Sequence, residues 1–225
     1  MKAVVFDWDG VVIDSSRQHE KSWELLAAAE NLPLPEGHFK RGFGKKNQTI
    51  IPGILGWTND DAEIERLARR KEETYRKLVA ESGVSILPGA RELLAALRSE
   101  KIPCAVGSST PRENLDAIFA ATSLGACFGA VACGDDVENG KPAPGIFLLA
   151  AEKLGIPANE CLVIEDAHSG IEAAHRAGMP VLAVATTHPA SSLNAATAVV
   201  ESLAEATPEL LRSVHKKGSM TAPLA

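Results

Sequence analysis

Short apolar runs alternate along most of this chain with segments of helical pattern, and this alternation limits the folds open to it. Each run is too short for a buried helix and rich in aliphatic residues, as expected of strands buried on both faces. The runs lie at residues 3–6, 104–107, 129–133, 162–164, 181–184 and, most weakly, 198–200. Strands that alternate with helices form right-handed βαβ units and a parallel sheet. We therefore expect an α/β core.

Residues 15–82 lack this strand pattern and show helical spacing instead. A first helix is expected at 17–30, and Ser15 or Ser16 is placed to cap it. Its apolar stripe is expected from Trp23, Leu25 and Leu26. A long, highly charged helix is expected at 61–81. This part of the chain therefore reads as a separate helical unit.

The change of pattern divides the chain into three parts. We predict a catalytic core from residues 1–14 and 84–216, because the strand pattern is confined to them. Residues 15–83 would form an inserted helical cap. The last residues, 217–225, are expected to form a mobile tail, because terminal residues are often poorly ordered.

Composition excludes several classes of protein. The net charge is −6, from 29 acidic and 23 basic residues, which argues against a nucleic-acid partner. No apolar stretch is long enough to span a membrane, and the chain opens on a strand pattern instead of a leader. The four cysteines form no C-x-x-C pair, so reduced thiols are expected and zinc is not. We expect a cytoplasmic protein, either a monomer or a weak homodimer.

Polar residues follow the carboxyl ends of the expected strands. They are Asp7 and Asp9, Ser108, Lys141, Glu165 and Asp166. Singly, each has an ordinary explanation: acids are common in turns, Ser108 or Glu165 with Asp166 could cap the helix that follows, and Lys141 could be a solvated loop lysine. The carboxyl ends of parallel strands lie at one edge, however, and ligands bind there. Together the residues predict a single site.

These residue types suit phosphoryl transfer. Asp7, Glu165 and Asp166 offer the hard oxygen ligands that Mg²⁺ prefers, and Ser108 and Lys141 could hold phosphate oxygens. One carboxylate can attack phosphorus and form an aspartyl-phosphate. A second, two residues on, can protonate the leaving oxygen and later deprotonate water. We assign Asp7 as the nucleophile and Asp9 as the acid–base.

Four segments resemble, in order, the motifs of the haloacid dehalogenase (HAD) superfamily: FDWDG at 6–10, VGS at 106–108, GKPAP at 140–144 and VIEDA at 163–167. The resemblance covers residues 1–190, and the helical unit is similar to the inserted cap of the phosphatase and β-phosphoglucomutase branch. It implies a Rossmann-like parallel sheet with helices on both faces, plus a small helical cap. It also implies Mg²⁺ as the cofactor.

The resemblance implies the same site roles and adds one ligand. Asp7 would be the nucleophile and Asp9 the acid–base, whose main-chain carbonyl would also bind Mg²⁺. Ser108 and Lys141 would grip phosphate, while Glu165 and Asp166 would complete the metal site. An acid at position 9 argues against the dehalogenases and phosphonatases of the superfamily, which do not need or do not have it.

Further residues are candidates for substrate binding. His19 and Lys71 resemble positions of the β-phosphoglucomutases, and the segment GKKNQ at 44–48 resembles their substrate-specificity loop. Asn47 stands where the mutases have an arginine for the far phosphate, so Lys45 or Lys46 would have to replace it. The candidates are Ser109, His19, Lys45, Lys46, Asn47 and Lys71. Alternatively, Lys71 lies on a solvated helix face and His19 makes a linker contact.

The sequence therefore predicts a Mg²⁺-dependent phosphohydrolase that acts on a small phosphorylated metabolite through an aspartyl-phosphate. The substrate would be a sugar, polyol or riboflavin-pathway phosphate; KIP at 101–103 and THP at 187–189 resemble plant phosphatases of riboflavin biosynthesis. The alternative is an isomerase, a sugar phosphomutase of the β-phosphoglucomutase type. A non-catalytic phosphate-binding module is least favoured, because no catalytic position is missing.

Overall fold

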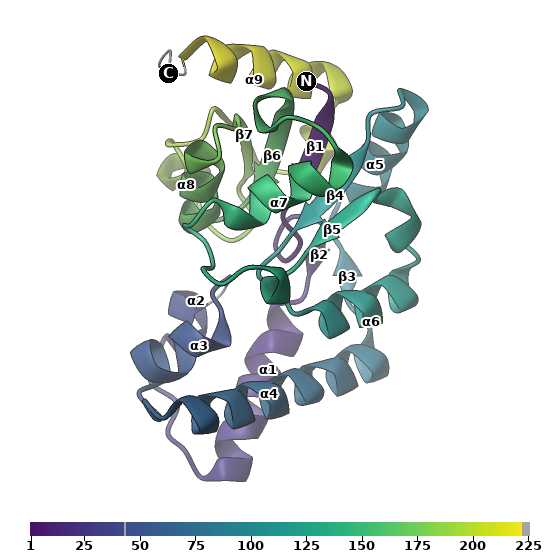
Figure 1. The fold of residues 1–225 in the computed structure, drawn as a ribbon. Coiled ribbons are helices and arrows are strands. Elements are labelled where there is room, and N and C mark those ends of the chain that lie inside the picture. The colour runs from purple at the N-terminus through teal and green to yellow at the C-terminus, as the bar shows by residue number, and fades with distance from the viewer. Residues whose placement is uncertain (43, 222–225) are drawn as a thin grey trace.

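The computed structural model describes residues 1–42 and 44–221, and its centre is a six-stranded parallel sheet (Figure 1). The strands are β1 (Ala3–Phe6), β4 (Cys104–Gly107), β5 (Ala130–Ala132), β6 (Cys161–Glu165), β7 (Val181–Val184) and β8 (Ala198–Val200). Their order is β5-β4-β1-β6-β7-β8, and each neighbouring pair is parallel. The predicted α/β core is confirmed.

The first strand lies in the middle of the sheet, and this explains its unbroken apolar sequence. β1 pairs with β4 on one side and β6 on the other. Successive side chains of a strand point to opposite faces, so Val4 and Phe6 enter one hydrophobic cluster while Ala3 and Val5 enter the other. All four are fully buried. Neither face of this strand can therefore accept a polar residue before the strand ends.

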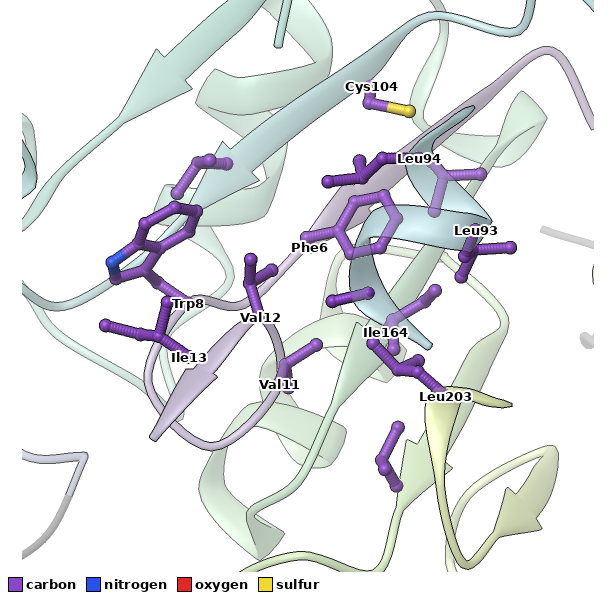
Figure 2. Packing of buried hydrophobic residues seen from close by; sticks show 14 of the residues in the cluster. Phe6, Trp8, Val11, Val12, Ile13, Leu93, Leu94, Cys104, Ile164 and Leu203 are labelled. Atoms are coloured by element: carbon purple, nitrogen blue, oxygen red, sulfur yellow. The ribbon is translucent and has the colours of Figure 1, made fainter. Parts of the chain in front are cut away.

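Helices cover both faces, as predicted. They are α5 (Ala90–Ser99), α6 (Arg112–Thr122), α7 (Gly145–Leu154), α8 (His168–Arg176) and α9 (Pro208–Thr221). Figure 2 shows Leu93 of α5 in the same hydrophobic cluster as Phe6. That cluster also includes apolar residues of α6 and α9. Phe147 of α7 and Ile171 of α8 fill the other cluster. The sheet is thus the middle of three layers.

The cap is built from helices alone within its described residues. Its elements are α1 (Ser16–Glu30), α2 (His38–Gly42), α3 (Asn47–Ile50), a π-helical turn (Ile51–Leu55) and α4 (Asp61–Ser82). Trp23 and Leu26 of α1 are buried in a separate hydrophobic cluster that includes Leu67 of α4. The prediction for Leu25 is wrong, because its side chain is 41% exposed. Positions spaced by three and four residues share a helix face, and here they are Trp23, Leu26 and Ala27.

Two very short strands connect the cap to the core. β2 (Ile13–Asp14) and β3 (Ser85–Ile86) pair antiparallel, so the outgoing and returning chains lie side by side. The amide of Gln18 ties the same region by donating to the carbonyl of Gly83 at 2.6 Å. Strands of two residues are too short to show a periodic pattern, which is why the sequence did not indicate them.

Two other expectations differ from the structure. The sequence indicates no helix at α9, which continues to Thr221, so the expected tail is helical over 217–221; residues 222–225 lie outside the described part. The segment at 44–48, expected to be a loop, includes the first two residues of α3. Across residues 1–42 and 44–221, no helix is long and apolar enough to cross a membrane.

The strand order fixes where a ligand can bind. The chain passes from β1 through β4 to β5 on one side of the sheet, and from β6 through β7 to β8 on the other. The crevice at such a reversal lies beyond the carboxyl end of the central strand. Here that end is Phe6, and Asp7 follows it directly. The cap is inserted just beyond this point (Figure 1).

Two glycines with left-handed backbone allow a test of the packing between the start of α5 and the chain near Ala204. Gly89 (φ +85°) begins α5, and a Cβ there would overlap the backbone of Ala204, whereas Gly178 (φ +71°) has open space around the same atom. Gly178→Ala should lower the free energy of unfolding by about 1 kcal/mol, the cost of the left-handed conformation. Gly89→Ala should lower it by about 3 kcal/mol, since the clash adds to that cost.

Urea denaturation of both variants measures this difference. Equal destabilisation by the two substitutions would show that the contact between Gly89 and Ala204 does not constrain the fold.

Candidate active site

Lys141 joins two of the predicted acids at the end of the central strand. Its ammonium donates to Asp7 Oδ1 at 2.7 Å and to Glu165 Oε1 at 2.6 Å. All three side chains are almost wholly buried. Lys141 comes from the loop between β5 and α7, while the acids follow β1 and end β6. The alternative that Lys141 is a solvated loop residue is therefore wrong.

Opposing effects act on the pKa of Asp7. Burial raises its pKa to about 7, the neighbouring carboxylates of Glu165 and Asp9 add to this, and Lys141 opposes it. Burial also works against the charge of Lys141, but Asp7 and Glu165 outweigh it and raise the lysine pKa. Because opposite charges favour ionised forms, a further cation beside Asp7 would favour its carboxylate.

Three carboxylates form a cluster that fits a divalent cation. One oxygen from each of Asp7, Glu165 and Asp166 lies within 4.8 Å of the others. Burial raises the pKa of Asp166 well above its usual range, and the charges of Glu165 and Asp7 raise it further. Such crowding is relieved by a bound cation, and hard oxygen donors are the ligands that Mg²⁺ takes. The residues present therefore fit the predicted metal.

Small residues and backbone amides position these carboxylates. A Cβ at Gly10 would overlap Asp166 Oδ2, and one at Gly170 would overlap Glu165 Oε1. Glu165 Oε2 accepts the backbone N–H groups of Asp166 and Ala167, both at 2.6 Å. Asp166 accepts from the hydroxyl of Thr187, a contact that the sequence did not indicate. The loop after β6 is thus shaped around its own acids.

The carboxylate of Asp9 lies apart from that cluster, within the described residues. Its Oδ1 accepts the hydroxyl of Ser15 and is 3.6 Å from His19 Nε2, and its Oδ2 accepts the hydroxyl of Thr110 at 2.5 Å. Burial opposes ionisation, but the bonds from His19, Ser15 and Thr110 outweigh it and lower the pKa of Asp9 to about 2. Only its main-chain carbonyl could therefore serve the metal as expected.

Residues expected to cap helices hold the site instead. Ser15 precedes α1 at its cap position but makes no side-chain cap bond, because its hydroxyl donates to Asp9. Thr110, before α6, does the same from the other side and donates its backbone N–H to Ser108 Oγ at 3.1 Å. In a sequence, a serine or threonine before a helix predicts a helix cap. The local sequence therefore gave no sign that Ser15 and Thr110 bond Asp9.

Lys71 and His19 extend the site into the cap. Lys71 is 2% exposed, and its Nζ is 2.7 Å from His19 Nδ1. The ring of His19 stacks on that of Tyr75, with centroids 4.0 Å apart. The alternative of a solvated face for Lys71 is wrong. Asp9, His19 and Lys71 form one connected row from core to cap.

Core and cap enclose a cavity of about 640 Å³. The predicted site residues all line it: Asp7, Asp9, His19, Lys45, Lys46, Asn47, Lys71, Ser108, Ser109, Lys141, Glu165 and Asp166. Lys46 differs from its expected role, since its ammonium donates to the core carbonyls of Val137 at 2.6 Å and Glu138 at 3.4 Å. The structure thus gathers the predicted residues around one space, while their catalytic roles stay predictions.

Known proteins are similar to this chain in sequence and in fold. A family model of haloacid dehalogenase-like hydrolases matches residues 1–178. The 5-amino-6-(5-phospho-D-ribitylamino)uracil phosphatase of Arabidopsis thaliana is 36% identical over 204 residues, which are 89% of this chain but 54% of that protein, so the chain spans about half its length. A phosphorylated carbohydrates phosphatase of Thermotoga maritima is 31% identical over 80% of this chain and 82% of its own.

Solved structures agree. The crystal structure of a β-phosphoglucomutase from Clostridium difficile superposes with a TM-score of 0.86 at 26% identity, covering 96% of this chain and 98% of that one. Both the phosphatase and the mutase branches therefore appear among its relatives, as the motifs predicted. By sequence and by structure, the chain belongs to the haloacid dehalogenase-like hydrolases.

Proposed function

We propose that this protein is a Mg²⁺-dependent phosphatase of small phosphorylated metabolites that works through an aspartyl-phosphate. The contact of Asp7 with Lys141 beside two further carboxylates carries the proposal, because a nucleophile, a cation that binds phosphate and a metal site would have to lie together, as these side chains do. The phosphatases among its relatives support it. The cavity of about 640 Å³ suits a small metabolite.

The chain's own residues would divide the reaction into two steps. Asp7 attacks phosphorus and the ester P–O bond breaks, while Asp9 gives its proton to the leaving oxygen. Ser108 and Lys141 hold the non-bridging oxygens. Water then attacks the phosphorus of the aspartyl-phosphate, Asp9 takes the proton from that water, and inorganic phosphate leaves with Asp7 restored. Mg²⁺, held by Asp7, Asp166, Glu165 and the Asp9 carbonyl, would offset the phosphate charge.

Asp9 must change its protonation between these steps. With a pKa of about 2 it favours the carboxylate, the form that accepts a proton from water. A phosphate dianion nearby favours the acid form, since a negative charge raises the pKa of an adjacent carboxyl. Ser15 and Thr110 hold the side chain in place for both forms.

The alternative is a sugar phosphomutase, which the likeness to the β-phosphoglucomutase structure favours. A mutase re-phosphorylates its intermediate and must exclude water from the aspartyl-phosphate. Phosphorus NMR separates the two reactions, because only the phosphatase accumulates inorganic phosphate.

The protein with Mg²⁺ should release inorganic phosphate from at least one member of a panel of sugar, polyol and nucleotide phosphates, followed by phosphorus NMR. Asp7→Asn should reduce this release by about 10⁴-fold or more, because an amide cannot serve as the nucleophile. EDTA should stop the release and excess Mg²⁺ should restore it. Asp116→Asn, an exposed acid on α6, is the matched control and should leave the rate unchanged.

Conversion of β-glucose 1-phosphate to the 6-phosphate without free phosphate, in the presence of a bisphosphate primer, would identify a mutase instead. Undiminished turnover by Asp7→Asn would contradict the nucleophile assignment.

Replacing Asp9 should affect poor leaving groups most. Asp9→Ala removes the proton donor, so release of an alkyl alcohol should slow by about 10²–10⁴-fold. p-Nitrophenolate leaves without a proton, so p-nitrophenyl phosphate should lose much less in the first step. Pre-steady-state kinetics with both esters measures that step alone. An equal loss for both would count against the acid role.

Lys46 gives the cap a direct hold on the core. Its ammonium bonds the carbonyls of Val137 and Glu138, and its stem lies against Gly140, next to Lys141. A closed cap excludes bulk water and strengthens the electrostatic interactions inside. We therefore assign Lys46 to cap closure and leave substrate contact from this loop to the exposed Lys45.

Lys46→Met keeps the stem and removes the donor. The lost charge-assisted bond is worth about 1.5 kcal/mol, so amide hydrogens of residues 44–50 should exchange roughly tenfold faster. Lys45→Met makes the same change of charge one residue earlier and should leave that exchange unaltered. Hydrogen–deuterium exchange followed by mass spectrometry reports both; identical behaviour of the two variants would exclude the closure role of Lys46.

A further inference from the structure

A buried carboxylate, Glu72, stands in the cap wall of the cavity where no motif predicted one. It follows Lys71 on α4, lines the cavity and is only 7% exposed. Carboxylates are rarely buried unless their oxygens are satisfied. Its partners therefore indicate what the cavity can still offer a substrate.

Three donors reach this carboxylate. Glu72 Oε1 accepts Asn47 Nδ2 at 2.6 Å and Lys71 Nζ at 3.0 Å, while Oε2 accepts Asn114 Nδ2 at 2.5 Å. A carboxylate has about four acceptor positions. Among the described residues Oε2 accepts one bond and Oε1 accepts two, so Oε2 is the oxygen with room for a further donor, on a side chain that lines the cavity.

The group is also charged. Burial opposes ionisation of Glu72, but Lys71, His19 and the two amides outweigh it and keep its pKa below the usual value. Because Asn114 belongs to α6, which packs on the sheet, the carboxylate is bonded both from the helical unit and from the part of the chain that carries the sheet. Its negative charge is thus a fixed feature of the cavity.

Nearby cations are already engaged. Lys71 bonds Glu72 and His19, and Lys46 bonds core carbonyls. Arg76 donates to Asn114 Oδ1 at 3.0 Å and pairs with Glu113 at 2.9 Å. Arg69, which also lines the cavity, lies 3.9 Å from a carboxylate oxygen of Glu65. Within the described lining, the charged acceptor at this part of the wall is therefore Glu72, with Lys45 exposed further out.

We propose that Glu72 is a specificity-determining residue: it accepts a hydrogen bond from a hydroxyl at the unphosphorylated end of the substrate and rejects substrates with a second phosphate there. The substrate class is then the monophosphates of hydroxyl-rich molecules, such as sugars and polyols. This inference rests on the proposed phosphatase function and adds to it the chemistry of the far end.

The preference for a hydroxyl and the rejection of a second phosphate both follow from the carboxylate of Glu72. A hydroxyl donating to a carboxylate makes a short, charge-assisted bond, stronger than one between neutral groups. A second phosphate brings two negative charges against a buried one, in surroundings that screen charge poorly. Selectivity then comes from a favourable contact with one class and repulsion of the other.

Matched substrates test the idea on the wild-type protein with Mg²⁺. We expect kcat/KM for fructose 1-phosphate to exceed that for fructose 1,6-bisphosphate by tenfold or more, measured as release of inorganic phosphate. Glu72→Gln keeps the shape but removes the charge, so it should lose most of this preference, chiefly through a lower KM for the bisphosphate. Glu73→Gln, its exposed neighbour on α4, should keep the preference.

A second variant covers the risk that Glu72→Gln does not fold. Glu72→Asp retains the charge on a shorter side chain, so it should still reject the bisphosphate while the KM for the monophosphate rises several-fold. An unchanged KM for the monophosphate in this variant would overturn the contact with the substrate hydroxyl.

p-Nitrophenyl phosphate has no hydroxyl group at its unphosphorylated end, so it distinguishes failure of the Glu72 proposal from failure of the phosphatase proposal. If the wild-type protein hydrolyses it but treats the fructose mono- and bisphosphates alike, or if Glu72→Gln keeps the preference, the role of Glu72 is overturned and the phosphatase function stands. If it hydrolyses neither this ester nor any sugar phosphate, both proposals fall.

Discussion

The repulsion among buried carboxylates at the end of the central strand is the constraint on which this structure depends. Asp7, Glu165 and Asp166 are brought together within a site that water hardly reaches, and such a cluster is unfavourable unless cations offset it. Lys141 supplies one positive charge. The two close glycines and the amides behind Glu165 fix the acids where their charges can be used. The proposed phosphate site and the proposed metal site both rest on this one arrangement.

The cap is joined to the core by polar contacts that begin at Asp9, beside the carboxylate cluster. A row of polar contacts runs from Asp9 through His19 and Lys71 to Glu72, and from there to Asn114 of the core. A buried polar network is stable only when every member finds its partners. Because the partners come from the helical unit at 15–83 and from the part that carries the sheet, the network joins these two parts of the chain in the arrangement seen here.

The sequence allowed much of the fold and site to be predicted, and the failures have identifiable causes. β1, β4 and β7 have the predicted bounds, because burial on both faces leaves a strong local pattern. β2 and β3, the two-residue strands that connect the cap to the core, are too short to leave such a pattern. Ser15 and Thr110 have the local pattern of helix caps but bond Asp9, and Lys46 has that of a phosphate-binding lysine but bonds the core. In each case a distant partner competes successfully with the local one.

The sequence by itself determined the fold class, the family and the set of polar residues at the carboxyl ends of the strands, because the alternation of buried strands and helices implies a parallel sheet and a parallel sheet collects those ends at one edge. Only the tertiary structure decided which polar atoms meet. Lys141 and Asp7 are 134 positions apart, and Thr110 and Asp9 are 101 apart. No periodic pattern spans such distances, so the partner of a buried polar side chain is set by how the elements pack in space.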